Sequence, residues 1–293
     1  MDKKVFVGIG ELLFDVFPSG RRIGGAPVNC AYHVAQLGVP SVAVSALGKD
    51  ELGDEIVRIM EEKHISGFVP RVDAPTGTVQ VQLDAKGVPT FTITENVAWD
   101  KIPSDPKLAE LAKNCCAVCF GTLAQRDPVS RKAIHMFLDA IPEGSDALIV
   151  YDVNLRQHYY DKDTIEASLR KCNILKINED EHVILAGMLG FNSKDPERGC
   201  RDMMAKYGLD IVILTCGASC SHVFWSGGHS LLDTPKVEVV DTVGAGDAFT
   251  AAFCASLLKG KGIPEAHRKA VDVSAFTCTC SGAMPVLPEI LKH

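Results

Sequence analysis

Residues 237–260 read VEVVDTVGAGDAFTAAFCASLLKG: an apolar run, a turn that contains two glycines, and a periodic apolar stretch before Gly260. The run at 237–240 is typical of a buried strand, and the apolar residues after Asp247 recur at helical spacing. The stretch therefore predicts a strand, a tight turn and a helix that ends near Gly260. A strand followed directly by a helix is the building unit of an α/β fold.

The same succession of strand and helix recurs from about Lys107 to the C-terminus, as short apolar runs alternate with amphipathic stretches of helical length. Further strands are predicted at residues 117–120, 147–151, 174–177 and 211–214, and helices at 128–140, 164–171, 179–188, 196–207 and 248–259. Apolar strands separated by crossover helices are typical of a parallel sheet covered on both faces. We therefore expect an α/β fold with a doubly wound, mostly parallel sheet.

The first hundred residues follow a different pattern. Residues 4–9 are typical of a core strand, whereas residues 78–84 and 90–94 alternate polar and apolar side chains around Ala85-Lys86-Gly87. This alternation and the Lys-Gly turn predict a half-exposed β-hairpin. A small β-sheet that projects from the core would contain this hairpin.

We expect one domain over residues 1–293, with a β-sheet lid from about residues 11–24 and 75–100, because no Pro/Ser/Gly-rich linker divides the chain. Such a lid could close over a ligand and exclude water. Alternatively, its edge could pair with a second subunit and form a homodimer.

Composition narrows the choice of partners. The chain has 293 residues, of which 46% are hydrophobic and 23% charged, and its net charge of −7 is spread without long runs of like charge. Nucleic-acid binding needs a basic surface, so we expect no nucleic-acid partner. The apolar run before Gly10 and Glu11 is too short for a signal peptide or a membrane span. We expect a cytoplasmic protein without a membrane partner.

Eleven cysteines are a high number for such a chain and invite a metal or redox interpretation. Cys116 and Cys119 form a CxxC, but this pair lies in an apolar, strand-like run without a second CxxC or paired histidines nearby. Cys278 and Cys280 lie among small residues. We expect free, packed thiols and no structural metal.

The glycine turn before the last predicted helix carries groups that suit phosphoryl transfer. Gly244 and Gly246 can adopt positive φ, and the N–H groups of a helix start can bind an anion. Asp247 lies in the first helical turn, where the helix dipole favours the ionised carboxylate. Phosphoryl transfer to an alcohol needs stabilised charge on the transferred group and a base for the hydroxyl proton. An ordinary turn with an aspartate cap explains the same residues without any chemistry.

The GAGDAF sequence at 244–249, preceded by Asp241-Thr242, resembles the C-terminal signature of the ribokinase/pfkB family of carbohydrate kinases. Residues 24–29, GGAPVN, with the helix-like CAYHVAQLG after them, resemble the N-terminal motif of that family in its fructokinase form. Gly8-Ile9-Gly10-Glu11 with Asp15 is similar to the first strand of fructokinases. Further segments with fructokinase-like counterparts are 97–100 (VAWD), 121–124 (GTLA) with Arg126, and 152–156 (DVNLR). The similarity extends from residue 8 to Gly282-Ala283.

This resemblance implies a ribokinase-like fold and an ATP-dependent sugar kinase that phosphorylates a primary hydroxyl, with D-fructose as the substrate and fructose 6-phosphate as the product. It implies that Asp247 is the catalytic base and that Gly244, Ala245 and Gly246 form the anion hole. The sugar-binding residues that it implies are Asp15, Gly25, Asn29, Trp99, Arg126 and Arg156.

On the nucleotide side, Asn178 with Glu181 resembles the NxxE element of the family, which is associated with Mg²⁺ and phosphate. Thr215-Cys216-Gly217 resembles the TxG turn that borders the nucleotide, although Cys220 stands where a glycine usually follows. The ATP-binding residues that the resemblance implies are Asn178, Thr215, Gly217, Gly244 and Gly246. It also implies an indirect contact of Glu181 with Mg²⁺ and is compatible with a K⁺ ion near Asp241.

Other interpretations are weaker or remain open. Gly8-Ile9-Gly10 follows a predicted strand, but Leu13 replaces the third glycine of a dinucleotide-binding fingerprint. Neither the GxxxxGK[ST] motif of P-loop kinases nor the protein-kinase motif set occurs in the chain. A kinase for ribose, 2-keto-3-deoxygluconate or a nucleoside stays an alternative, as does a sugar-sensing protein of the same fold, since one fold serves several functions.

Overall fold

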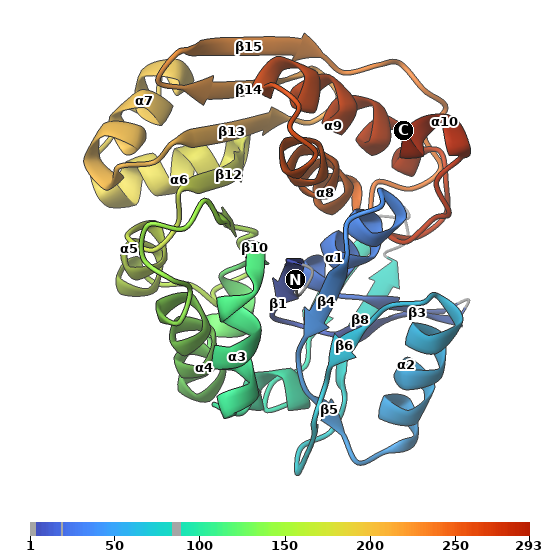
Figure 1. The fold of residues 1–293 in the computed structure, drawn as a ribbon. Helices are drawn as coiled ribbons and strands as arrows, with labels where there is room; N and C mark the ends of the chain where they lie inside the picture. Colours follow the sequence, from blue (N-terminus) through green and yellow to red (C-terminus); the bar gives the residue numbers. More distant parts are fainter. Residues whose placement is uncertain (1–3, 19, 84–88) are drawn as a thin grey trace.

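A nine-stranded sheet forms the centre of the molecule in the computed structural model, which describes residues 4–18, 20–83 and 89–293 (Figure 1). From one edge to the other its strands are β15 (Gly228–Asp233), β14 (Cys220–Trp225), β13 (Ile211–Cys216), β12 (Ile174–Asn178), β11 (Leu148–Asp152), β10 (Cys115–Phe120), β1 (Val5–Ile9), β4 (Ser41–Val44) and β6 (Gly67–Phe68). All pairs from β13 to β6 are parallel, whereas β14 and β15 extend the sheet as an antiparallel hairpin. The predicted doubly wound, mostly parallel α/β fold is confirmed.

Alternating side chains of the strands build an apolar core on each face of the sheet. In β10, Val118 and Phe120 enter one core while Ala117 and Cys119 enter the other. The first core is covered by α3 (Pro106–Lys113), α4 (Pro128–Asp139), α5 (Lys162–Leu169), α6 (Glu179–Leu189) and α7 (Pro196–Tyr207). The second core is covered by α1 (Ala26–Gln36), α2 (Glu51–Glu62), α8 (Ala245–Leu258) and α9 (Ile263–Cys278). Burial on both faces explains why the strands read as continuous apolar runs.

Most of the predicted elements lie where the sequence places them. The predicted strands at 4–9, 117–120, 147–151, 174–177 and 211–214 correspond to β1, β10, β11, β12 and β13. The five predicted helices correspond to α4 to α8, although α8 begins at Ala245, three residues earlier than expected. Gly260 follows α8 with a φ of 80°, the left-handed conformation expected after a helix end.

The strand predicted at residues 237–240 was wrong, because this segment has no regular secondary structure. The edge of β13 beside which it could have paired is already occupied by β14. The N–H groups of Val240 and Asp241 instead donate to the carbonyl oxygen of Cys278, at 2.9 and 3.2 Å. Val239 and Val240 are consequently 60% and 62% exposed. The segment thus reaches the start of α8 as an irregular loop.

A second sheet of four strands lies beside the central one and contains the predicted hairpin. Its order is β3 (Gly20–Gly24), β2 (Leu13–Phe17), β8 (Gly77–Leu83) and β9 (Pro89–Ile93). Strands β8 and β9 pair in antiparallel fashion, with Val79 opposite Ile93, so the hairpin is confirmed. Its predicted turn at Ala85-Lys86-Gly87 lies outside the described residues. The strands fall within the ranges 11–24 and 75–100 that we expect to form a lid.

Smaller elements complete the chain: β5 (Leu47–Gly48), β7 (Arg71–Val72), two 3₁₀ turns at Ala98–Lys101 and Leu123–Gln125, and α10 (Glu289–Lys292). All eleven cysteines are free thiols. In the described part of the chain, no helix combines the length and the hydrophobicity needed to cross a membrane.

Candidate active site

A cavity of about 1280 Å³ opens at the carboxyl ends of β11, β12 and β13. Side chains of the four-stranded sheet, among them Leu13, Asp15 and Phe17, form one wall, and the start of α8 with residues of α9 forms another. In open α/β sheets, ligands bind outside the carboxyl ends of the strands. The fold therefore places this cavity where a substrate site is expected.

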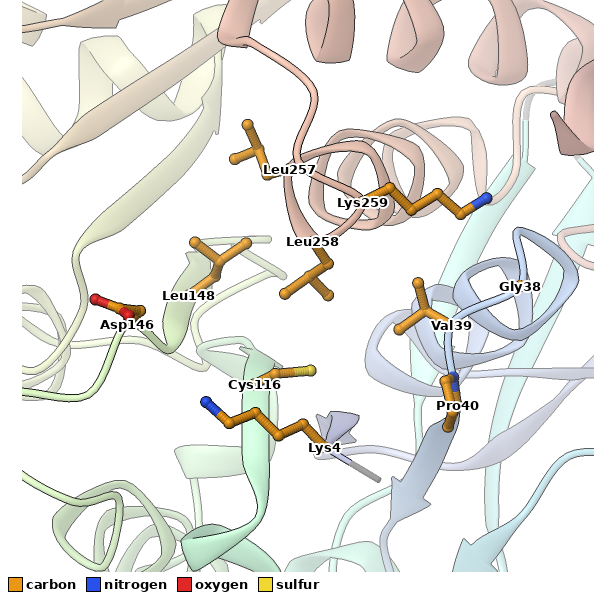
Figure 2. A pocket seen from close by; sticks show the side chains of 10 residues that line it. All are labelled: Lys4, Gly38, Val39, Pro40, Cys116, Asp146, Leu148, Leu257, Leu258 and Lys259. Atoms are coloured by element: carbon orange, nitrogen blue, oxygen red, sulfur yellow. The ribbon is translucent and has the colours of Figure 1, made fainter. Parts of the chain in front are cut away.

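A second pocket, of about 510 Å³, lies at the amino ends of β1, β10 and β11 (Figure 2). Leu148, Leu257 and Leu258 contribute much of its apolar wall, and Lys4 and Cys116 stand on the side opposite α8. None of the predicted site residues lines this pocket. Most of the predicted site residues line the larger cavity instead.

The glycine turn before α8 borders the larger cavity and requires glycine at position 244, whereas Gly246 does not adopt the positive φ that we expected for it. Gly244 caps the helix with a φ of 78°, and a Cβ atom there would lie 2.5 Å from the Cβ of Ala283. A Cβ atom on Gly246 would lie 3.1 Å from the Nζ of Lys176. A helix start leaves the N–H groups of its first turn without intrahelical partners. The bare backbone at Gly244, Ala245 and Gly246 can therefore bind an anion that approaches from the cavity.

Asp247 follows this turn and lies beside a predicted sugar-binding residue, since Asn29 Nδ2 donates a hydrogen bond of 2.7 Å to Asp247 Oδ2. Burial and then the negative charge of Asp152 raise the pKa of Asp247 to about 7, against the smaller lowering effects of Asn29 and Lys176. Burial and the charge of Asp152 thus outweigh the stabilisation of the ionised form that we expect from the helix dipole. A carboxylate that titrates near neutral pH is well suited to act as a general base.

Lys176 is a site residue that sequence reasoning missed. Its Nζ lies 3.0 Å from Asp152 Oδ1, while Thr250 Oγ1 donates to the other oxygen of Asp152 at 3.1 Å. Burial alone would lower the pKa of Lys176, but the charges of Asp152 and Glu181 raise it above its usual range. Lys176 therefore remains a cation beside the anion-binding turn. The signal in the sequence was a lysine inside the otherwise apolar run ILKI at 174–177.

The predicted sugar side of the cavity contains Asp15, Gly25 and Asn29, together with Glu11, which was not predicted as a site residue. Asn29 Oδ1 and Glu11 Oε2 are buried and have no hydrogen-bond partner in the described part of the chain. The other oxygen of Glu11 accepts a hydrogen bond from Ala26 N at 3.2 Å. Because buried polar atoms normally have partners, these two free acceptors indicate where hydroxyl groups of a ligand can bind.

Charge also converges on Asp15. Burial raises the pKa of Asp15 to about 6, the positive charge of Arg156 opposes that rise, and Asp241 adds to it. Arg156 is exposed and lines the cavity, with its Nη1 donating to the carbonyl oxygen of Leu155 at 3.0 Å. The guanidinium group therefore remains available to a ligand in the cavity.

On the predicted nucleotide side, Asn178, Glu181, Thr215 and Gly217 all line the cavity. Glu181 N donates to the side-chain oxygen of Asn178 at 2.8 Å, and both Glu181 carboxylate oxygens accept backbone N–H groups, from Asn178 at 2.8 Å and Leu155 at 2.9 Å. Glu181 thus holds two strand ends together. With both oxygens engaged, it is better placed to contact a cation through water than directly.

Two predicted sugar-binding residues, Trp99 and Arg126, are not among the residues that line the cavity. Both nitrogens of one edge of the Arg126 guanidinium bind Asp100, at 2.8 and 2.9 Å, and the group stacks 4.0 Å from the centroid of Trp99. The Arg126 side chain is only 8% exposed. Through this buried ion pair and a hydrogen bond to the carbonyl oxygen of Thr94, Arg126 links the segment after β9 to the segment after β10.

Asp241 stabilises the loop before α8. Its carboxylate accepts hydrogen bonds from Val243 N and Gly282 N, both at 3.0 Å, and forms an ion pair with Arg22 at 3.2 Å. The side chain is outside the cavity lining, whereas its neighbour Thr242 is part of it. Asp241 therefore supports the anion-binding turn from behind.

Comparison with known proteins agrees with this geometry. Residues 11–290 match the family described as pfkB family carbohydrate kinase. An ATP-dependent 6-phosphofructokinase of Thermoanaerobacterium thermosaccharolyticum is 29% identical, covering 99% of this chain and 92% of the relative. A fructokinase of Klebsiella pneumoniae is also 29% identical, over 98% of this chain and 97% of the relative.

The same fold occurs in a crystal structure of fructokinase from Vibrio cholerae O395 in a fructose, ADP and calcium ion bound form. That structure superposes with a TM-score of 0.81 and 22% identity, covering 97% of this chain and 96% of that chain.

Proposed function

The chain belongs to the pfkB family of carbohydrate kinases, and on this premise we propose that it is an ATP-dependent fructokinase, which converts D-fructose to fructose 6-phosphate. One observation carries the proposal: the hydrogen bond of 2.7 Å between Asn29 and Asp247 joins the sugar side of the cavity to a carboxylate beside the anion-binding turn. A kinase acting on an alcohol needs these three parts in contact. The fructokinase relatives, which align over nearly the whole chain, support D-fructose as the acceptor.

In the proposed reaction, the primary hydroxyl of the sugar donates its proton to Asp247 as its oxygen attacks the γ-phosphorus of ATP. A new O–P bond forms, the bond between the γ-phosphorus and the β,γ-bridging oxygen breaks, and ADP leaves with that electron pair. The N–H groups of the turn at Gly244 to Gly246 and the Lys176 cation bind the transferred phosphoryl group. Such preorganised donors stabilise negative charge in the transition state.

The residues present fit a divalent cation that travels with ATP. Mg²⁺ neutralises charge on the phosphates when bound and keeps several waters, so it needs few direct protein ligands. Glu181 would contact it through water, because both of its oxygens already accept backbone N–H groups. We also propose a K⁺ ion near Asp241 and Thr242, to be tested by replacing K⁺ with tetramethylammonium in the assay.

The four-stranded sheet is proposed to act as a lid. It contributes Asp15, Phe17 and Val79 to the cavity wall, so its movement would open or close the sugar side. Closure would exclude water and limit wasteful hydrolysis of ATP. Strands β3 and β9 are the edges of this sheet, and an edge can pair with a second copy to form a homodimer. Light scattering would report the oligomeric state.

A panel of acceptors tests the substrate assignment. With ATP and Mg²⁺, fructose should support ADP release with a kcat/KM at least about tenfold above that of ribose, 2-keto-3-deoxygluconate and nucleosides, a ratio of about 1.4 kcal/mol. Phosphorus NMR should identify the product as fructose 6-phosphate. Faster turnover of another acceptor would replace fructose, and tight sugar binding without ADP release would identify a sensor rather than a kinase.

A second candidate is phosphorylation of fructose 6-phosphate, because Arg156 projects a guanidinium group into the cavity and can bind a phosphate on the sugar. The variant Arg156→Gln distinguishes the two. If fructose 6-phosphate is the substrate, the variant should raise its KM by at least about tenfold, in line with the loss of a hydrogen bond to a charged group. For fructose, the KM should change much less.

A further inference from the structure

A cluster of three metal-ligating side chains lies at the turn between β13 and β14, outside the catalytic groups described above. Cys216 ends β13 and faces Cys220, the first residue of β14, as its direct partner across the two strands. His222 follows two residues later in β14, so its side chain lies on the same face as Cys220. All three side chains are half-buried. Two thiols and one imidazole thus meet at one point of the sheet surface.

The distances suit one metal ion. One ligand atom from each of Cys216, Cys220 and His222 lies within 4.8 Å of the other two. Cys220 Sγ and His222 Nε2 are 3.5 Å apart. A tetrahedral Zn²⁺ ion, with bonds of about 2.3 Å to sulfur and about 2.05 Å to nitrogen, places these two atoms about 3.6 Å apart. The pair Cys220 and His222 is therefore already close to the spacing that Zn²⁺ requires, and Cys216 lies within reach of the same ion.

A third strand orients the imidazole. His222 Nδ1 lies 3.0 Å from His229 Nε2 of β15, and the two rings stack with their centroids 5.2 Å apart. When Nδ1 carries the proton of this hydrogen bond, Nε2 presents a lone pair toward Cys220. Ligating histidines commonly donate their other ring N–H to a neighbouring group, which fixes the tautomer. His229 provides that support here.

The cluster is also distinctive within the described part of the chain, where no other three His, Cys, Asp or Glu residues come equally close. The CxxC at Cys116 and Cys119, by contrast, has no third ligand among the residues that the structure describes. From the sequence we expected no structural metal. That expectation rested on cysteine motifs such as the CxxC, in which the ligands are close together in the chain. Pairing across two antiparallel strands brings Cys216, Cys220 and His222 together instead.

We propose that Cys216, Cys220 and His222 form a binding site for Zn²⁺, with one coordination position left open to water or an exogenous ligand. On binding, both thiols release their protons and the thiolates and the neutral imidazole each donate an electron pair to the metal. Thiolate and imidazole ligands favour Zn²⁺ over Mg²⁺. Cys220 and Gly217 line the nucleotide side of the cavity, so the ion would tie together the turn that borders ATP.

Metal binding by the full-length protein, reduced with a phosphine and kept free of nucleotide, tests the site. Competition against a chromophoric Zn²⁺ indicator in excess Mg²⁺ should reveal one Zn²⁺ bound per chain. The variant Cys220→Ser should weaken this binding by at least about 100-fold, the upper range seen when even a supporting residue is lost. The matched control Cys116→Ser removes a half-buried thiol in the distant pocket of Figure 2 and should retain the wild-type affinity.

Two further measurements test whether these three side chains themselves bind the metal. Co²⁺ should produce a thiolate-to-metal charge-transfer band in the wild-type protein that is absent in Cys220→Ser. If circular dichroism shows that Cys220→Ser is unfolded, His222→Asn, which keeps both thiols, should show the same loss of affinity. Wild-type protein that binds no Zn²⁺ in excess Mg²⁺, equal weakening by Cys116→Ser, or a folded His222→Asn variant with unchanged affinity would each overturn the site. None of these measurements depends on which sugar the enzyme phosphorylates.

Discussion

Replacing Asp247 with asparagine should lower activity but raise stability, because its carboxylate is the proposed base and burial makes its ionised form unfavourable. Asparagine has nearly the same shape, and its Oδ1 can still accept the hydrogen bond that Asn29 Nδ2 donates at 2.7 Å. The sugar side should therefore keep its geometry. The proton acceptor is lost, so kcat should fall by about 100-fold or more, as is typical of the loss of a general base.

The same change should stabilise the fold in a pH-dependent way. Burial raises the pKa of Asp247 to about 7 from an ordinary value of 3.8. Because the unfolded chain ionises this group first, the wild-type fold loses stability as pH rises from about 4 to about 7. At about 1.4 kcal/mol per pH unit, the loss is roughly 2 kcal/mol at pH 5 and about 4 kcal/mol at pH 8. The variant lacks this carboxylate and escapes the loss.

Two assays check these expectations. A coupled ADP assay with saturating fructose measures kcat, and urea unfolding at pH 5 and pH 8 measures the free energy of unfolding. The stability of Asp247→Asn relative to wild type should increase by roughly 3 kcal/mol between the two pH values. The exposed Asp146, in the second pocket, provides the control Asp146→Asn, which should leave kcat unchanged and add no such pH dependence. Near-normal kcat in Asp247→Asn would remove Asp247 as the base, and a pH-independent stability difference would refute its unfavourable burial.

Three further substitutions probe the groups around this carboxylate. Lys176→Met should lower kcat by about 100-fold, because the anion-binding turn loses its cation. It should also lower the free energy of unfolding by about 3 kcal/mol, because the carboxylate of Asp152 stays buried without its partner. An unchanged kcat would exclude a role of Lys176 in phosphoryl transfer. Asn29→Ala removes a hydrogen bond that lowers the pKa of Asp247, so the acidic limb of the kcat/KM profile should move to higher pH, and a shift to lower pH would contradict this coupling. Arg126→Ala breaks a buried ion pair and should cost about 3–5 kcal/mol of stability without changing the KM for fructose, whereas a raised KM in a stable variant would return Arg126 to the sugar site.

Local patterns were sufficient to predict the fold class and the turn at the centre of the proposed site. Apolar runs and helical periodicity involve residues only a few positions apart in the chain. The ends of strands β10 to β13 and of helices α4 to α8 could therefore be predicted within a few residues. The glycine turn could be predicted as well, because a positive φ at Gly244 is a local requirement. Asp247 directly follows this turn in the chain, so the sequence alone places the two side by side.

Other features could only be decided by the tertiary structure. The run at 237–240 is apolar enough for a strand, yet β14 takes the neighbouring place in the sheet. Trp99 and Arg126 are residue types that can bind sugars, yet the structure pairs Arg126 with Asp100, and neither Trp99 nor Arg126 lines the cavity. Lys176 lies in an apolar strand, where only its contact with Asp152 from the next strand reveals a charged group beside the turn.

The pKa of Asp247 and the cluster at Cys216, Cys220 and His222 depend on tertiary structure most of all. The helix dipole, which sequence position does reveal, is outweighed by burial and by Asp152, a residue from another strand. The thiol cluster forms because β14 reverses direction against β13, and its imidazole is oriented from β15. The sequence alone specified the helices and strands, because their periodicity is a local property of the chain. The tertiary structure set the pKa of Asp247 and the set of possible Zn²⁺ ligands, because both depend on which residues from distant parts of the chain lie together in a low-dielectric interior.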